Sequence, residues 1–232
     1  MSRSGPVSRR STKTEYIETV GDKDTHCLML DIFCWYGARV LGRLMMADTG
    51  NKISRRSHIE GKQNIMLGGR SVVMAGVTLR GDLFRRPDRP AEGEKEGPST
   101  AITVGRASII STNCTIRPPM RLSRGQMTFY PMRISDNVFI GAGTHVSSLS
   151  ISSHVHIGAN CVLMPFCVIK EQCKILPNTV VPPHMIIPPG SLVAGRPARI
   201  IGEVPEGWGQ GGGGDEEFVE GGDLRPLVKS IK

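Results

Sequence analysis

The sequence predicts an all-β fold, a parallel solenoid whose short strands wind around a narrow prism. Between Ile134 and Val193 the chain divides into units of six residues. Each unit begins with an aliphatic residue, and a small residue usually follows four positions later. Apolar residues spaced by three and four would indicate a helix, and residues spaced by two an ordinary strand. A period of six fits neither, and is typical of a hexapeptide solenoid whose coils bury their apolar rows against each other.

The main run of hexads defines the predicted interior. Every step is six residues long except the five-residue step from Val146 to Ile151. We expect the aliphatic openers, Ile157 among them, to point into the prism, with strands stacked about 4.8 Å apart. The openers are Ile134, Ile140, Val146, Ile151, Ile157, Leu163, Ile169, Ile175, Val181, Ile187 and Val193.

Earlier hexads extend the prism toward the N-terminus. They open at Ile53, Ile59, Ile65, Val72, Val77, Val104, Ile110 and Ile116. Two segments leave the frame, a charged Pro/Gly-rich loop at 84–100 and a basic loop at 117–133. Such segments are expected outside the coils, because turn-forming and charged residues do not fit the interior.

The predicted organisation is one domain with appendages. A basic N-terminus (1–13) is expected to be disordered, and the β-helix occupies 14–206. Within it, 16–19 alternates like a strand, whereas 21–49 is atypical, with no hexads and with spacing that would allow an amphipathic helix. The remainder, 207–232, reads as a Gly-rich linker, an acidic stretch and a short segment at 224–231 that we expect to be a brief helix.

Composition limits the function classes. The N-terminus lacks an apolar leader, so the six cysteines are expected to be reduced thiols, and Cys161, Cys167 and Cys173 to be small interior residues rather than a metal cluster. No run of about 20 apolar residues predicts a membrane span. The net charge of +8 could suggest nucleic acid, but the arginines are scattered among loops with no recognised nucleic-acid fold, and acidic protein partners explain the charge at least as well.

Hexapeptide prisms also host two enzymatic chemistries. One is acyl transfer with a histidine as general base, and 188–198 is similar to the closing coil of hexapeptide acyltransferases. The other resembles the gamma-class carbonic anhydrases, which bind zinc through three histidines. Here the matching positions hold Arg117, Ala142 and Ser147, so we expect no zinc, no cofactor and no catalytic residues. Both enzyme types remain alternatives to a structural role.

Two further pairs complete this comparison. Arg80 and Asp82 stand in an Arg-Gly-Asp strand end that carbonic anhydrases share, and we interpret them as a structural pair that ties adjacent coils. His154 and His156 are expected to alternate on one strand and share a face, but no third metal ligand accompanies them.

A set of short strings resembles the dynactin subunit 5 family. The strings occur in order between residues 13 and 206, outside the inserted stretches: KTEYIET (13–19), GNKISRRS (50–57), QNI (63–65), LRGDL (79–83), IRPP (116–119), ISDNVFI (134–140), CKILPNTV (173–180) and GEVPE (202–206). Hexads alone are common, whereas these strings together are specific.

The resemblance implies a left-handed parallel β-helix and a non-enzymatic scaffold role in the pointed-end complex of dynactin. The implied partners are the sister β-helix subunit, the pointed-end actin-related protein and other dynactin subunits, and indirectly dynein and cargo adaptors such as those on early endosomes. The implied location is the cytoplasm, on the microtubule cytoskeleton, without membrane insertion or nucleic acid.

The basic loop at 117–133 supplies the candidate interaction residues. They are Arg117, Arg121, Arg124, Phe129 and Tyr130. Arginine and tyrosine are frequent hot-spot residues at protein interfaces. The alternative is a loop that folds back over the prism. The N-terminal end of the prism is a second candidate, because it has no obvious cap and an open end exposes unpaired strand groups.

The atypical stretch at 21–49 generates the first prediction. In the resembled family the strand at 16–19 continues almost directly into Gly50, so a retained intron or an error in the gene boundaries would explain the interruption. We expect sequenced transcripts to include messages that join Val20 to Gly50. Deleting 21–49 should leave a folded prism, and transcripts that all retain the segment would refute the hypothesis.

Overall fold

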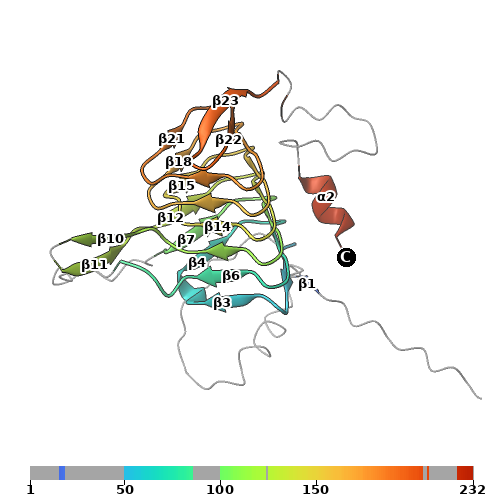
Figure 1. Ribbon diagram of the computed structural model, residues 1–232. Helices are drawn as coiled ribbons and strands as arrows, with labels where there is room; N and C mark the ends of the chain where they lie inside the picture. Colours follow the sequence, from blue (N-terminus) through green and yellow to red (C-terminus); the bar gives the residue numbers. More distant parts are fainter. Residues whose placement is uncertain are drawn as a thin grey trace, which may run out of the picture.

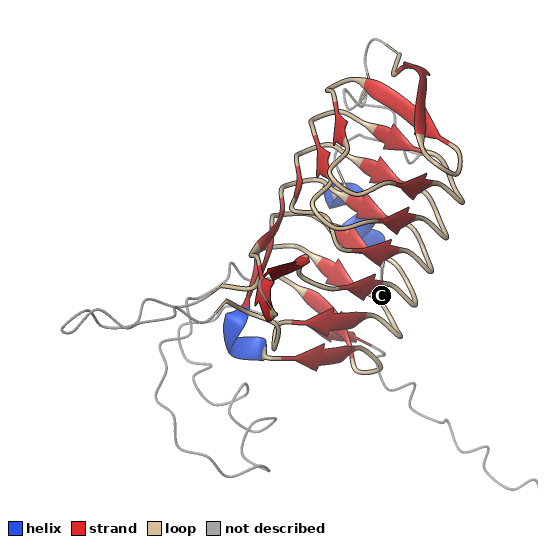
Figure 2. Ribbon diagram, turned by 60° about the vertical axis from the view of Figure 1, so that its left-hand side comes forward, coloured by secondary structure: helices blue, strands red, loops and turns tan. Residues whose placement is uncertain are grey.

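The structure is a computed structural model that describes residues 16–18, 50–85, 100–123, 125–205, 208 and 224–231. Three sheets form the sides of a prism, and the chain passes from one side to the next in each coil (Figure 1). One sheet has nine strands and each of the other two has six. The strands are short and stack as successive rungs (Figure 2), with a hairpin formed by β10 (Met120–Ser123) and β11 (Gln126–Phe129) on one side and helix α2 (Arg225–Ser230) on another (Figure 1).

Each coil places one strand on each face. The first face contains β1 (Tyr16–Glu18), β2 (Lys52–Ser54), β5 (Val72–Val73), β8 (Ile109–Ile110), β13 (Phe139–Ile140), β16 (His156–Ile157), β19 (Lys174–Ile175), β22 (Ser191–Ala194) and β23 (Arg199–Glu203). The second contains β3 (His58–Glu60), β6 (Thr78–Arg80), β9 (Thr115–Ile116), β14 (His145–Val146), β17 (Val162–Leu163) and β20 (Val180–Val181). The third contains β4 (Ile65–Leu67), β7 (Ile102–Val104), β12 (Met132–Ile134), β15 (Ser150–Ile151), β18 (Val168–Ile169) and β21 (Ile186–Ile187).

Parallel register stacks the hexad openers into columns. On the first face Ile140 pairs with Ile157, and Ile157 pairs with Ile175 in the next coil. All three are fully buried in one continuous core, and the equivalent openers of the other two faces join the same core. The predicted interior row is therefore confirmed, Ile157 included.

The corners explain the small residues. Most turns contain a residue with positive φ, and in the corner from the first to the second face these are Gly76, Asn113, Gly143, Asn160 and Asn178. Glycine and asparagine adopt this left-handed backbone at the lowest cost. The residue after a positive-φ position points inward in all three corners. Cys161, Cys167 and Cys173, which follow Asn160, Phe166 and Gln172, are fully buried free thiols. Burial raises the pKa of each thiol, that of Cys167 to about 12.

The two ends of the prism are closed to different degrees. At the C-terminal end β23 turns back antiparallel to β22, and the Ala198 N–H donates to the Val180 carbonyl at 2.8 Å. At the N-terminal end β1, the predicted strand, pairs antiparallel with β2 on the first face. Among the described residues, β3 and β4 are the edge strands of the other two faces at this end, as β20 and β21 are at the C-terminal end.

Helix α2 (Arg225–Ser230) confirms the predicted brief helix and lies against the first face (Figure 1). Leu224 and Val228 are buried against the outward-pointing Val72 and Ile109. Among the described helices none is long and apolar enough to cross a membrane. The predicted disordered N-terminus, the atypical stretch 21–49, most of the loop 84–100 and the acidic stretch lie outside the described residues.

The core column predicts a severe effect for Ile157→Asp. The change buries an unpaired carboxylate at a position with 0% exposure, which should lower the free energy of unfolding by more than about 4 kcal/mol. Val162→Asp is the matched control, because this half-buried side chain points outward from β17 and should cost about 1 kcal/mol. Denaturant unfolding measures both, and equal stabilities would contradict the hexad assignment.

Candidate interaction surfaces

A β-hairpin projects from the corner between the second and third faces (Figure 1). It consists of β10 (Met120–Ser123) and β11 (Gln126–Phe129), whose register pairs Ser123 with Gln126 across a two-residue connection. Gly125 in that connection has a φ of 77°, which glycine adopts freely. The alternating apolar and polar residues on both sides of Arg124-Gly125 are the sequence signal for this hairpin.

One side of the hairpin is apolar. Met120 pairs with Phe129 and Leu122 with Met127, and alternation along each strand places these four residues on the same side. We call them the apolar side of the hairpin. Leu122 is 71% exposed and Met127 58% exposed, so their side chains extend into solvent rather than into the core. Exposed large apolar side chains in one patch mark candidate protein interaction sites.

The structure places the candidate interaction residues of the basic loop at different positions on and around the hairpin. Phe129 lies on the apolar side, whereas Arg121 pairs with Thr128 on the opposite side and is exposed. Arg117 lies at the base, with its Nη2 3.6 Å from the Met120 sulfur. Arg124 lies outside the described residues. The apolar residues Met120, Leu122 and Met127 were missed, although their alternation could have identified them.

Tyr130 joins the base of the hairpin to the prism. Its ring meets the edge of Phe166 at a centroid distance of 5.3 Å, and Phe166 stacks on His184 at 5.2 Å. Its N–H donates to the Pro119 carbonyl at 2.9 Å and closes the hairpin. Tyr130 and Phe166 belong to coils that are separated by the short corner at 147–149, the site of the five-residue step. The shortened corner allows the two rings to meet.

Arg80 and Asp82 form a surface pair, but the tie between coils involves another residue. The Arg80 guanidinium donates to both Asp82 carboxylate oxygens at 2.8 Å within one coil. Its Nε also lies 2.9 Å from Glu60 Oε2 on β3, the neighbouring coil. The hydrogen bond from Arg80 lowers the pKa of Asp82. Because these groups are exposed, they orient the corner more than they stabilise the fold.

The positions compared with zinc ligands bring together few reactive groups. Ser147 Oγ lies 3.5 Å from His145 Nε2, and burial together with the nearby Arg117 lowers the pKa of His145. Ala142 lies in a corner of another edge. Within the described ranges, no cluster of three or more histidine, cysteine, aspartate or glutamate residues is arranged to hold a metal ion.

The two neighbouring histidines do not share a strand, so that expectation was wrong. His154 occupies a corner with a φ of 58°, whereas His156 lies on β16. The His156 ring is only 8% exposed and stacks on Phe139 at a centroid distance of 4.7 Å. Burial, and secondarily the charge of Lys174, lower its pKa to about 4. His156 is therefore a neutral packing residue on the first face.

These coils, with their turned-back final strand, define a left-handed parallel β-helix of the hexapeptide-repeat class. A family model for dynactin subunit 5 matches residues 92–210, more than half of the chain. The chain therefore belongs to the dynactin subunit 5 family. A curated relative, dynactin subunit 5 of Dictyostelium discoideum, is 36% identical over 104 residues. That match covers 45% of this chain and 44% of the relative, so the chain aligns with less than half of the relative's length.

Among solved structures, the likeness to one N-acyltransferase concerns the fold alone. AntD, an N-acyltransferase from Bacillus cereus in complex with dTDP and 3-hydroxybutyryl-CoA, matches with a TM-score of 0.50 and 14% identity over 67% of this chain and 80% of AntD. A hexapeptide transferase family protein from Anaplasma phagocytophilum matches with a TM-score of 0.49 and 17% identity, over 78% and 88% of the two chains. At such low identity these likenesses say nothing about catalysis.

The buried His156 predicts a pH-dependent stability. Its folded-state pKa of about 4 lies below the ordinary value of 6.5, so the unfolded chain binds the additional proton between these values. Stability is therefore complete above pH 6.5 and falls as the pH drops toward 4, by up to about 3 kcal/mol. The denaturant midpoint should depend less on pH between pH 4 and 7.5 in His156→Phe than in the unchanged protein. His58→Gln, at an exposed histidine, is the control and should keep the original pH dependence. An unchanged slope in His156→Phe would contradict this assignment.

Proposed function

We propose that this protein is a non-enzymatic structural subunit of the dynactin pointed-end complex. The observation that carries the proposal is the family match over 92–210. The residues at the positions of the carbonic anhydrase ligands support a role without catalysis, because Arg117, Ala142 and Ser147 cannot replace three imidazoles. What the subunit contributes is a rigid body with surfaces for neighbouring subunits.

The hairpin is the surface best suited to a stable subunit contact. The exposed Leu122 and Met127 would lose their water shell on docking, which is the main favourable term in protein association. Tyr130 and Phe166 fix the base, so less conformational entropy is lost on binding. Arg121 on the other side can pair with an acidic rim, consistent with the net charge of +8.

The proposed neighbours are the sister β-helix subunit, the pointed-end actin-related protein and other dynactin subunits. Through them the protein supports dynein-based transport and the attachment of cargo adaptors, such as those on early endosomes, in the cytoplasm and on microtubules. Arg117, Arg121, Arg124, Phe129 and Tyr130 remain candidate contact residues, now joined by Met120, Leu122 and Met127. The second candidate surface is formed by β3 and β4, which among the described residues are the edge strands at the N-terminal end of their sheets, since strand edges accept further pairing.

The hairpin predicts a selective loss of partners. Leu122→Ser together with Met127→Ser should reduce recovery of at least one dynactin subunit at least fivefold in an affinity pull-down read by mass spectrometry. The melting temperature should not fall, because both side chains are exposed.

The matched control changes the opposite side of the same hairpin, Arg121→Ala with Thr128→Ala. A larger loss in this control would assign the contact to the polar side. Unchanged recovery in both variants would remove the hairpin from the interface. If the unmodified chain recovered no dynactin subunit, the scaffold role itself would be overturned.

A further inference from the structure

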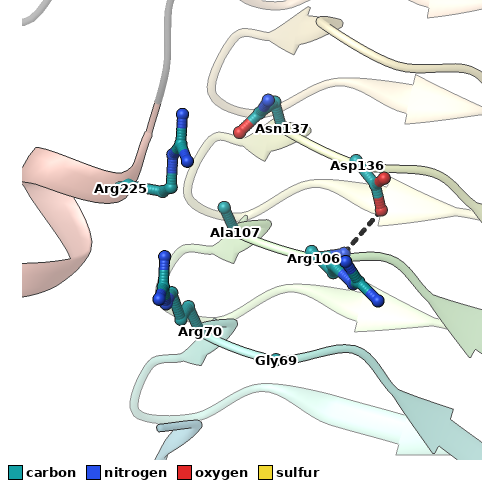
Figure 3. A pocket seen from close by; sticks show the side chains of 7 residues that line it. All are labelled: Gly69, Arg70, Arg106, Ala107, Asp136, Asn137 and Arg225. Carbon is teal, nitrogen blue, oxygen red and sulfur yellow. Dashed lines mark hydrogen bonds between the residues drawn. The ribbon is translucent and has the colours of Figure 1, made fainter. Parts of the chain in front are cut away.

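We propose that a pocket at the corner between the third and first faces binds a phosphate group. The pocket has a volume of about 430 Å³. Three arginines line it, Arg70, Arg106 and Arg225, together with Ala107, Asp136 and Asn137 (Figure 3). It lies at a different corner from the hairpin, and the proposal does not depend on the identity of any partner subunit.

Three stacked corners build the wall of the pocket. Arg70, Ala107 and Asn137 occupy the same turn position in successive coils, with φ values of 61°, 53° and 55°. Backbone hydrogen bonds fix their spacing, from the Ala107 N–H to the Gly69 carbonyl at 3.0 Å and from the Asn137 N–H to the Arg106 carbonyl at 2.9 Å. Ala107 contributes only a methyl group between two longer side chains, which leaves the space that forms the pocket (Figure 3).

The C-terminal helix contributes the third arginine. Leu224 and Val228 anchor α2 in an apolar cluster with Val72 and Ile109 on the first face. This contact brings Arg225, in the first turn of α2, to the corner (Figure 3). In that view the guanidinium groups of Arg225 and Arg70 lie on either side of the Ala107 methyl. Arg225, which lies 155 positions after Arg70 in the sequence, thus completes the pocket.

The charge of the lining is predominantly positive. Among the described residues of the lining, Asp136 is the one carboxylate, and its Oδ1 accepts the Arg106 backbone N–H at 2.7 Å (Figure 3). Guanidinium groups bind phosphate and carboxylate oxygens through paired hydrogen bonds, and are more easily desolvated than ammonium groups. An excess of arginine in a concave site therefore favours an anionic ligand.

The Asn137 amide provides a second, independent observation. Its Oδ1 is buried and has no hydrogen-bond partner within the part of the chain that the structure describes. A buried acceptor without a partner is costly, so this position calls either for a donor or for the amide turned by half, with its NH₂ group here. Oxygen and nitrogen of an amide exchange places by a half turn, after which the NH₂ group would donate into the pocket. A phosphate group offers enough oxygens for two guanidinium groups and this amide, whereas a carboxylate offers two.

Isothermal titration calorimetry on the full chain tests the proposal. The probes are inorganic phosphate, O-phosphoserine and adenosine monophosphate, at constant ionic strength set with sodium chloride. We expect at least one phosphate compound to bind tenfold more tightly than acetate, and the three probes distinguish a free ion, a phosphorylated side chain and a nucleotide as the source. Arg70→Gln with Arg225→Gln should weaken binding at least tenfold, while Arg55→Gln, an exposed corner arginine elsewhere, should leave it unchanged.

A second pair of variants remains informative if changing Arg225 disturbs α2. Ala107→Asp places a carboxylate between the two guanidinium groups, whereas Ala107→Asn adds a side chain of similar size without charge. Both residues tolerate the positive φ at this position. We expect at least tenfold weaker phosphate binding in Ala107→Asp than in Ala107→Asn. Equal affinities in these two variants, or acetate binding as tightly as the phosphate probes, would reduce the result to an adventitious ion only and overturn the proposal.

Discussion

Parallel hydrogen bonding between coils, over an interior only a few side chains wide, is the constraint on which the structure depends. Each strand on a prism side donates and accepts along the axis, so a coil that changes its length on a face breaks both neighbouring ladders. Departures from the six-residue frame are therefore confined to corners. The loop after β6, the hairpin after β9 and the short corner after β14 all interrupt the corner between the second and third faces, in three successive coils. The edge between the second and third faces therefore contains the main departures from the six-residue frame.

The sequence predicts the interior well because, in this fold, the six-residue period alone determines which side chains point into the core. Ile157 and the three corner cysteines were placed correctly from spacing alone. The strand at 16–18 and the helix at 225–230 were also found, since both have local signals. What spacing could not predict was any contact that crosses coils. The inter-coil partner of Arg80 is Glu60, and naming it requires the register of β3 against β6.

Sequence pattern and strand pairing emphasise different residues of the candidate surface at 117–133. The sequence predicts arginines and aromatic residues as the contacts, whereas the strand pairing identifies Leu122 and Met127 as the exposed apolar pair. The Tyr130 ring packs on Phe166, since the intervening corner is one residue short, and the residue pattern of the loop does not predict this contact. His154 was misplaced for a related reason, since a corner residue with positive φ does not continue the alternation of the following strand.

The return of α2 to the first face joins the two halves of the chain mechanically. A solenoid usually frays one coil at a time from either end, since each coil contacts only its neighbours. Here Val72 and Ile109, in the second and third coils, hold a helix that follows the closing strand in sequence. Fraying that reaches these coils from the N-terminal end also releases the C-terminal helix. Under tension applied between the termini, the contact of α2 with Val72 and Ile109 would therefore have to break in addition to the hydrogen bonds between coils.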